Sequence, residues 1–75
     1  MENSDLGKYF VVYMYRTEHG SIAPFFLTYN NILSAQGAIA YLKSRDDVLE
    51  ATIAVRMERE NIEVAKWNFR NEMRP

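Results

Sequence analysis

The chain has 75 residues, of which 48% are hydrophobic and 25% charged, a composition typical of a folded domain rather than a disordered chain. This length supports one hydrophobic core, so we expect a single domain over residues 1–75, with residues 1–7 and 70–75 as frayed tails. Nine basic and ten acidic residues give no positive surplus for nucleic-acid binding, and the absence of cysteine excludes disulfides.

No targeting signal is visible in the sequence. The amino-terminal stretch MENSDLGK is polar and acidic, whereas a signal peptide begins with basic residues and an apolar run. The longest apolar run, Tyr9 to Tyr15, is far shorter than the roughly 20 residues of a membrane-spanning helix. We therefore expect a cytoplasmic protein without membrane contact.

The first half of the chain predicts a β-hairpin. Lys8 to Thr17 is rich in Tyr, Phe and Val, which favour strands, and Ile22 to Tyr29 is suited to the return strand. Between them, Glu18 to Ser21 contains Gly20, which can adopt the positive φ of a tight turn. Pro24 has no N–H to donate, so it predicts an edge strand or the entrance to the strand.

The next segment changes to the helical period. Ser34 is the expected N-cap and Asn31, one turn earlier, is the alternative. Gly37 lowers helix propensity by about 1 kcal/mol, which suggests a close packing contact. The apolar stripe of this predicted helix, about three turns long, consists of Ala35, Ala38, Ile39 and Leu42.

Asp46 to Glu60 carries signals for both helix and strand. Asp47 and Glu50 have the spacing of a capping box, yet apolar and polar residues alternate from Ala51 onward with several β-branched side chains. We predict a strand. A polar turn and a final strand, Ile62 to Phe69, follow it, with a bulge predicted between Val64 and Trp67 where the alternation slips.

These elements predict an α+β fold of order ββαββ: a four-stranded, mostly antiparallel sheet with one helix packed on one face. One helix leaves the other face uncovered. Alternation separates Phe10, Val12 and Met14 from the tyrosines of the first strand, and we expect these three under the helix. Phe25, Leu27, Ile53 and Val55 are expected beside them.

The uncovered face would then carry an aromatic surface, which is typical of protein interfaces. Three alternatives remain open: the faces are reversed or covered by the chain termini, two copies form a homodimer through this face, or another protein binds there. The predicted protein-binding or dimer interface consists of Tyr9, Tyr13, Tyr15, Arg16, Phe26, Arg56 and Trp67.

Motifs for chemistry are absent from the sequence. His19 is the only histidine and lies in the predicted turn, and the adjacent Asp46 and Asp47 are better suited to capping than to acid–base catalysis. The three glycines are far apart, so no phosphate-binding loop exists. We therefore expect a non-enzymatic protein without a cofactor or a metal.

A single-stranded nucleic-acid-binding module is the alternative function, because exposed sheet aromatics can stack on bases. The candidate residues would be Tyr13, Tyr15, Arg16, Arg56, Lys66 and Arg70. The interleaved acidic residues and the absence of a ribonucleoprotein-type consensus argue against this function.

The layout YFVVYMYRTEHGS, FFLTYNNI, AIAYLKSR and ATIAVRMER, over Tyr9 to Arg59, resembles small accessory proteins of bacteriophages and mobile elements. The chain departs from the simplest of these by lacking a Gly-Phe-Gly turn and by adding Ile62 to Pro75. The resemblance implies a non-catalytic protein that binds a host protein, such as a component of the defence or transcription machinery, and inhibits it.

Overall fold

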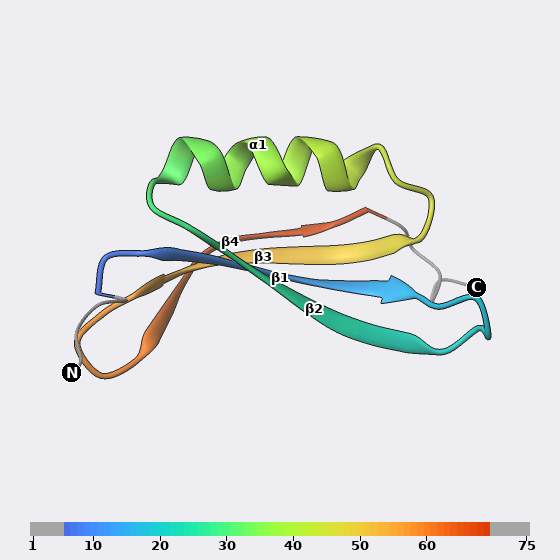
Figure 1. The fold of residues 1–75 in the computed structure, drawn as a ribbon, viewed down its shortest axis with the longest axis horizontal. Coiled ribbons are helices and arrows are strands. Elements are labelled where there is room, and N and C mark those ends of the chain that lie inside the picture. The colour runs from blue at the N-terminus through green and yellow to red at the C-terminus, as the bar shows by residue number, and fades with distance from the viewer. Residues whose placement is uncertain (1–5, 70–75) are drawn as a thin grey trace.

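The computed structural model describes residues 6–69 and confirms the predicted α+β fold of order ββαββ (Figure 1). Of the predicted tails 1–7 and 70–75, residues 1–5 and 70–75 lie outside the described residues. Gly7 donates its N–H to the Arg56 carbonyl at 2.9 Å. The elements are β1 (Tyr9–Arg16), β2 (Ile22–Tyr29), α1 (Ile32–Lys43), β3 (Val48–Arg56) and β4 (Asn61–Asn68).

The four strands form one antiparallel sheet in the order β2-β1-β3-β4. β1 and β3 are central, so the strand predicted from the ambiguous segment pairs on both sides. β2 is an edge strand, as Pro24 predicted, because a residue without an N–H is tolerated where no further strand pairs. The second edge is β4.

The β1–β2 turn is built around Thr17 and Gly20. Gly20 has a φ of +88°, as the turn prediction required, and its N–H donates to the Thr17 carbonyl at 2.9 Å. The Thr17 hydroxyl accepts from the N–H groups of His19 and Ser21. This local network sets the register in which Arg16 lies opposite Ile22.

The helix begins one turn earlier than Ser34 would place it. Asn31 is the N-cap, with extended backbone, and its Oδ1 accepts from the Ser34 N–H at 2.8 Å. At the other end, the Ser44 N–H and hydroxyl both donate to the Tyr41 carbonyl, which satisfies an otherwise orphan acceptor. A Cβ added at Gly37 would meet no described atom within 4 Å, so this glycine serves no close packing contact.

Two irregularities interrupt the sheet. β3 contains one extra residue, because the neighbouring β1 residues Met14 and Tyr15 lie opposite Glu50 and Val48. β4 also contains one extra residue, Val64, because the neighbouring β3 residues Ile53 and Ala54 lie opposite Ala65 and Glu63. The predicted bulge is therefore at the start of the expected interval.

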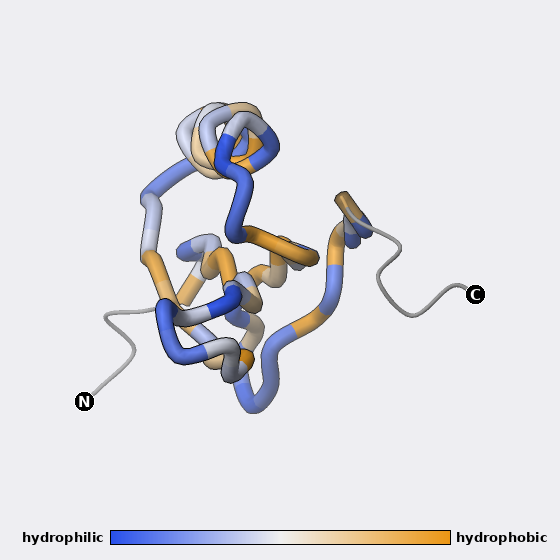
Figure 2. The backbone as a smooth tube through the Cα atoms, turned by 90° about the vertical axis from the view of Figure 1, so that its right-hand side faces the viewer, coloured by the Kyte–Doolittle hydropathy of each residue, from blue (hydrophilic) through white to orange (hydrophobic). Residues whose placement is uncertain are grey.

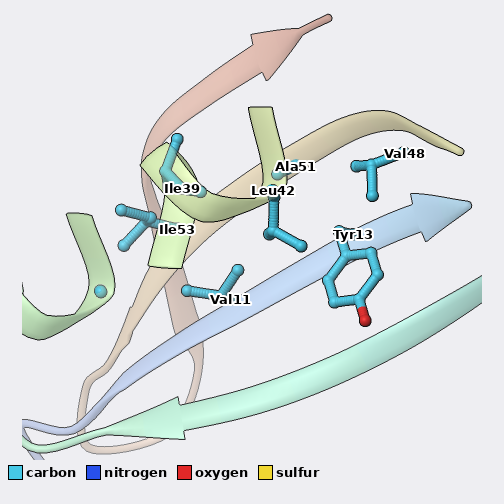
Figure 3. Close-up of a cluster of buried hydrophobic side chains, with 8 residues drawn as sticks. Val11, Tyr13, Ile39, Leu42, Val48, Ala51 and Ile53 are labelled. Carbon is cyan, nitrogen blue, oxygen red and sulfur yellow. The ribbon is translucent and has the colours of Figure 1, made fainter. Parts of the chain in front are cut away.

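The core lies between α1 and the sheet, and it corrects the predicted faces of β1. Val11 and Tyr13 are buried on the helix side of the sheet (Figure 3). The alternation of side chains along the strand then places Phe10, Val12 and Met14 on the opposite side. The buried residues are Val11, Tyr13, Ala35, Ile39, Leu42, Val48, Ala51 and Ile53. Phe25, Leu27, Ile53 and Val55 are on the helix side, as predicted.

The physical reason lies in register and side-chain size. Ile53 faces the helix, and antiparallel pairing brings Val11, its direct cross-strand neighbour, to the same face. Ala51, the cross-strand neighbour of Tyr13, is small and fully buried, which leaves room for the Tyr13 ring. β1 thus directs its tyrosines inward.

α1 packs on β1, β2 and β3, and no described element packs on the opposite sheet face. Viewed at right angles to Figure 1, the helix lies on one side of the strands (Figure 2). We call the uncovered side of the sheet the open face.

Candidate functional site

The open face carries a continuous apolar surface over β1 and β2. Cross-strand pairing places Phe10 opposite Thr28, Val12 opposite Phe26, Met14 opposite Pro24 and Arg16 opposite Ile22. We call six of these residues the open-face patch: Phe10, Val12, Met14, Ile22, Pro24 and Phe26.

Several patch side chains are exposed to solvent. Phe26 is 64% exposed and Ile22 52%, while Phe10, Val12 and Met14 are half-buried by their strand neighbours. Exposed apolar residues that form a contiguous patch, rather than single scattered ones, usually mark an interaction surface.

Polar and charged residues follow this patch on its β1 side, where the open face continues onto β3 and β4. By register, the open face of β3 carries Glu50, Thr52, Ala54 and Arg56, and β4 adds Glu63 and Lys66. The Lys66 ammonium is 4.0 Å from the Glu50 carboxylate, so charges of both signs lie side by side. The apolar patch therefore lies at the β2 edge of the open face, with charges of both signs along one side of it, and an apolar area next to a polar rim is typical of protein interfaces.

The structure divides the predicted interface residues between the two faces. Arg16, Phe26 and Arg56 are on the open side of their strands, as expected. The other four pack against the core on the helix side: Tyr9, Tyr13, Tyr15 and Trp67.

Five of the six patch residues were not predicted as interface residues from the sequence: Phe10, Val12, Met14, Ile22 and Pro24. Their alternation with the core residues was visible, but it gave no indication of which set lies outside.

The buried Tyr13 is the centre of a polar and aromatic cluster that the sequence did not predict. Arg45 donates through Nε and Nη2 to both carboxylate oxygens of Asp47, at 2.9 and 2.6 Å, and through Nη1 to the Tyr13 hydroxyl at 3.3 Å. Its guanidinium carbon is also 5.5 Å from the Tyr13 ring centre. The hydrogen bonds with Asp47 raise the pKa of Arg45 above its ordinary value.

This cluster explains how a tyrosine can be 6% exposed in a small core. The Tyr13 hydroxyl accepts a hydrogen bond from the charged Arg45 side chain at the edge of the core. The centroid of the Tyr13 ring lies 5.5 Å from that of Phe25 and 5.9 Å from that of Tyr15. Arg45 and Asp47 therefore join the α1–β3 connection to β1. Their role is structural.

A groove of about 420 Å³ lies between α1 and β4, because the helix does not extend over the edge strand. Its lining residues are Ile39, Lys43, Trp67, Asn68 and Phe69. Trp67 therefore borders a groove on the helix side instead of joining the open face.

The histidine of the chain, His19, lies on the surface in the β1–β2 turn. The His19 side chain is 85% exposed and its Nε2 is 3.9 Å from a Glu18 oxygen. Over residues 6–69, no group of three or more His, Asp or Glu side chains is placed to hold a metal ion. None of the helices in this part of the chain is long and apolar enough to cross a membrane.

Comparison of the chain with protein-family models, with curated proteins and with solved structures found no match.

Proposed function

We propose that this protein is a non-enzymatic protein-binding module whose partner packs on the open-face patch. The observation that carries the proposal is the uncovered apolar surface of β1 and β2, on which Phe26 is 64% exposed. The resemblance in layout to phage accessory proteins adds the proposal that the partner is a host protein that the module inhibits.

The composition of this surface favours a protein over other partners. Phe, Met and Arg are enriched at protein interfaces, and the patch with its border contains all three. Phe26 lies midway along the edge strand β2, opposite Val12 of β1, where a bound partner would exclude water from its ring.

A nucleic-acid partner is less well supported by the geometry. Tyr13 and Tyr15, the expected base-stacking residues, lie on the helix side. Phe10 and Phe26 are the open-face aromatics. The charges beside them are mixed, since Arg16, Arg56 and Lys66 share the face with Glu50 and Glu63, and such a face is not the basic groove on which phosphate binding depends.

The test compares Phe26→Lys with Tyr41→Lys in affinity capture from lysate of the native cells. Tyr41 is the matched control because it is 62% exposed but lies on the helix, away from the sheet. We expect both variants to keep the wild-type circular dichroism. Phe26→Lys should lose the protein captured by the wild type, at least tenfold in a subsequent affinity measurement with the purified partner, since burying an aromatic ring contributes about 1.5–3 kcal/mol.

Two results would oppose the proposal. Equal capture by both variants would place the partner elsewhere. Capture of single-stranded RNA or DNA that depends on Phe26 would favour the nucleic-acid function instead.

A further inference from the structure

β4 is the edge of the sheet at which another strand can pair. The opposite edge, β2, contains Pro24, which lacks a backbone donor, whereas β4 contains no proline from Asn61 to Asn68. An edge strand presents unpaired N–H and C=O groups that form a template for a further strand.

The bulge at Val64 changes which β4 side chains share a face. Without it, Glu63 and Lys66 would point to opposite sides, because they are three residues apart. With it, both lie on the open face, opposite Ala54 and Thr52. The same displacement brings Ile62 and Trp67 together on the helix side, opposite Val55 and Ala51.

This distribution makes β4 complementary to itself. In an antiparallel pair of two β4 strands with Asn61 opposite Asn68, every residue of the strand is paired. Glu63 then lies opposite Lys66 of a second copy, and the twofold symmetry repeats this ion pair. On the helix side, Ile62 lies opposite Trp67 of the second copy, also twice.

Neighbouring registers lack this match. A shift of one residue sets open-face side chains against helix-side ones, for example Glu63 against Trp67, and a shift of two leaves strand ends unpaired and separates Glu63 from Lys66. Ile62 is 41% exposed in the single chain, so pairing with a tryptophan would also cover an apolar side chain.

We propose that the protein forms a symmetric homodimer by antiparallel pairing of β4 with β4 of a second copy. The result is a continuous eight-stranded sheet with both α1 helices on one side and both open faces on the other. The proposal is independent of the proposed function, because the open-face patch on β1 and β2 remains uncovered in this dimer.

A charge-swap series measured by analytical ultracentrifugation over a dilution range tests the pairing. Glu63→Lys sets like charges opposite each other at two symmetric positions, so the dimer dissociation constant should rise at least about tenfold. Combining Glu63→Lys with Lys66→Glu restores opposite charges and should recover most of the wild-type dissociation constant. Phe26→Lys is the control and should leave the dimer intact.

The register is tested by disulfide trapping, which is clean because the chain has no cysteine. Asn61→Cys mixed with Asn68→Cys should yield a cross-linked heterodimer. Either variant alone should cross-link poorly, since equivalent positions at this register are about 23 Å apart.

Three results would overturn the proposal: a wild-type chain that is monomeric at every concentration, a Glu63→Lys variant that dimerises like the wild type, or a dimer that is abolished by Phe26→Lys. The last would indicate face-to-face packing. Loss of partner capture with an intact dimer would instead bear on the proposed function alone.

Discussion

Two adjacent valines provide the sharpest test of which sheet face the helix covers. Val11 is fully buried beneath α1, opposite Ile53, whereas Val12 lies on the open face, opposite Phe26 and half-buried. Both are in the same strand, so alanine substitution lowers the intrinsic strand preference equally at the two positions. The difference between Val11→Ala and Val12→Ala therefore reports burial.

The magnitude follows from the methyl groups removed. Each variant removes two, worth about 0.8 kcal/mol each when fully buried. At Val11 the vacated volume of about 50 Å³ remains as a cavity, which adds about 1 kcal/mol and gives a total loss of about 2–3 kcal/mol. At Val12 water enters the vacated space and burial is incomplete, so we expect a loss of about 0.5–1 kcal/mol.

Urea unfolding followed by circular dichroism measures both free energies of unfolding, at one protein concentration so that any self-association affects the variants alike. For a domain of this size, the expected difference between the variants corresponds to a gap in Tm of about 5–15 °C. Equal losses, or a larger loss for Val12→Ala, would refute the assignment of Val11 to the core and of Val12 to the open face.

The other predictions concern the Tyr13 cluster and two glycines. Arg45→Met should lower the free energy of unfolding by only about 1 kcal/mol, because Arg45 and Asp47 are partly exposed. A double-mutant cycle of Arg45→Met with Asp47→Asn should give a coupling energy, and the absence of one would contradict a stabilising ion pair between the two residues. Because hydrogen bonding to Asp47 raises the pKa of Arg45 on folding, its stabilisation is complete below the pKa of the unfolded state and is lost only as the pH rises through the higher pKa of the folded state. The difference in unfolding free energy between wild type and Arg45→Met should thus stay constant from about pH 6 to 9, and a decline over that range would be evidence against the assignment. Gly37→Ala should raise the free energy of unfolding, measured in urea, by up to about 1 kcal/mol, since the added methyl group meets open space. Gly20→Ala should lower it by about 1 kcal/mol, because the backbone there has a φ of +88°. A change of the same sign in both variants would contradict the backbone conformations assigned to the two glycines.

The order of the elements along the chain could be predicted from local signals. Gly20 indicated the first turn, Pro24 indicated an edge strand, and the apolar stripe with helical spacing through Ile39 and Leu42 indicated the helix. Each signal reflects a short-range constraint, either on backbone dihedrals or on the spacing of side chains along one face. Such constraints are present in the sequence itself.

The face of β1 could not be predicted because every residue from Tyr9 to Tyr15 is apolar or aromatic. A strand whose two side-chain sets are both apolar carries no pattern to show which set is covered. The choice depends on the fit between the Tyr13 ring and the small residue Ala51, and on Arg45, which is 32 positions away in the chain. The β1 tyrosines, predicted at the interface, therefore lie on the helix side in or against the core, while Phe26 lies on the open face as predicted.

Photo-crosslinking in the native cell tests the central claim, which is that a partner protein packs on the open-face patch. A photoreactive phenylalanine analogue is placed at Phe26 in one variant and at Tyr41 in another, two positions of nearly equal exposure on opposite sides of the molecule. We predict a covalent adduct with a different protein from the Phe26 position and none from the Tyr41 position. The absence of a protein adduct from the Phe26 position, whether or not the Tyr41 position gives one, would contradict the claim.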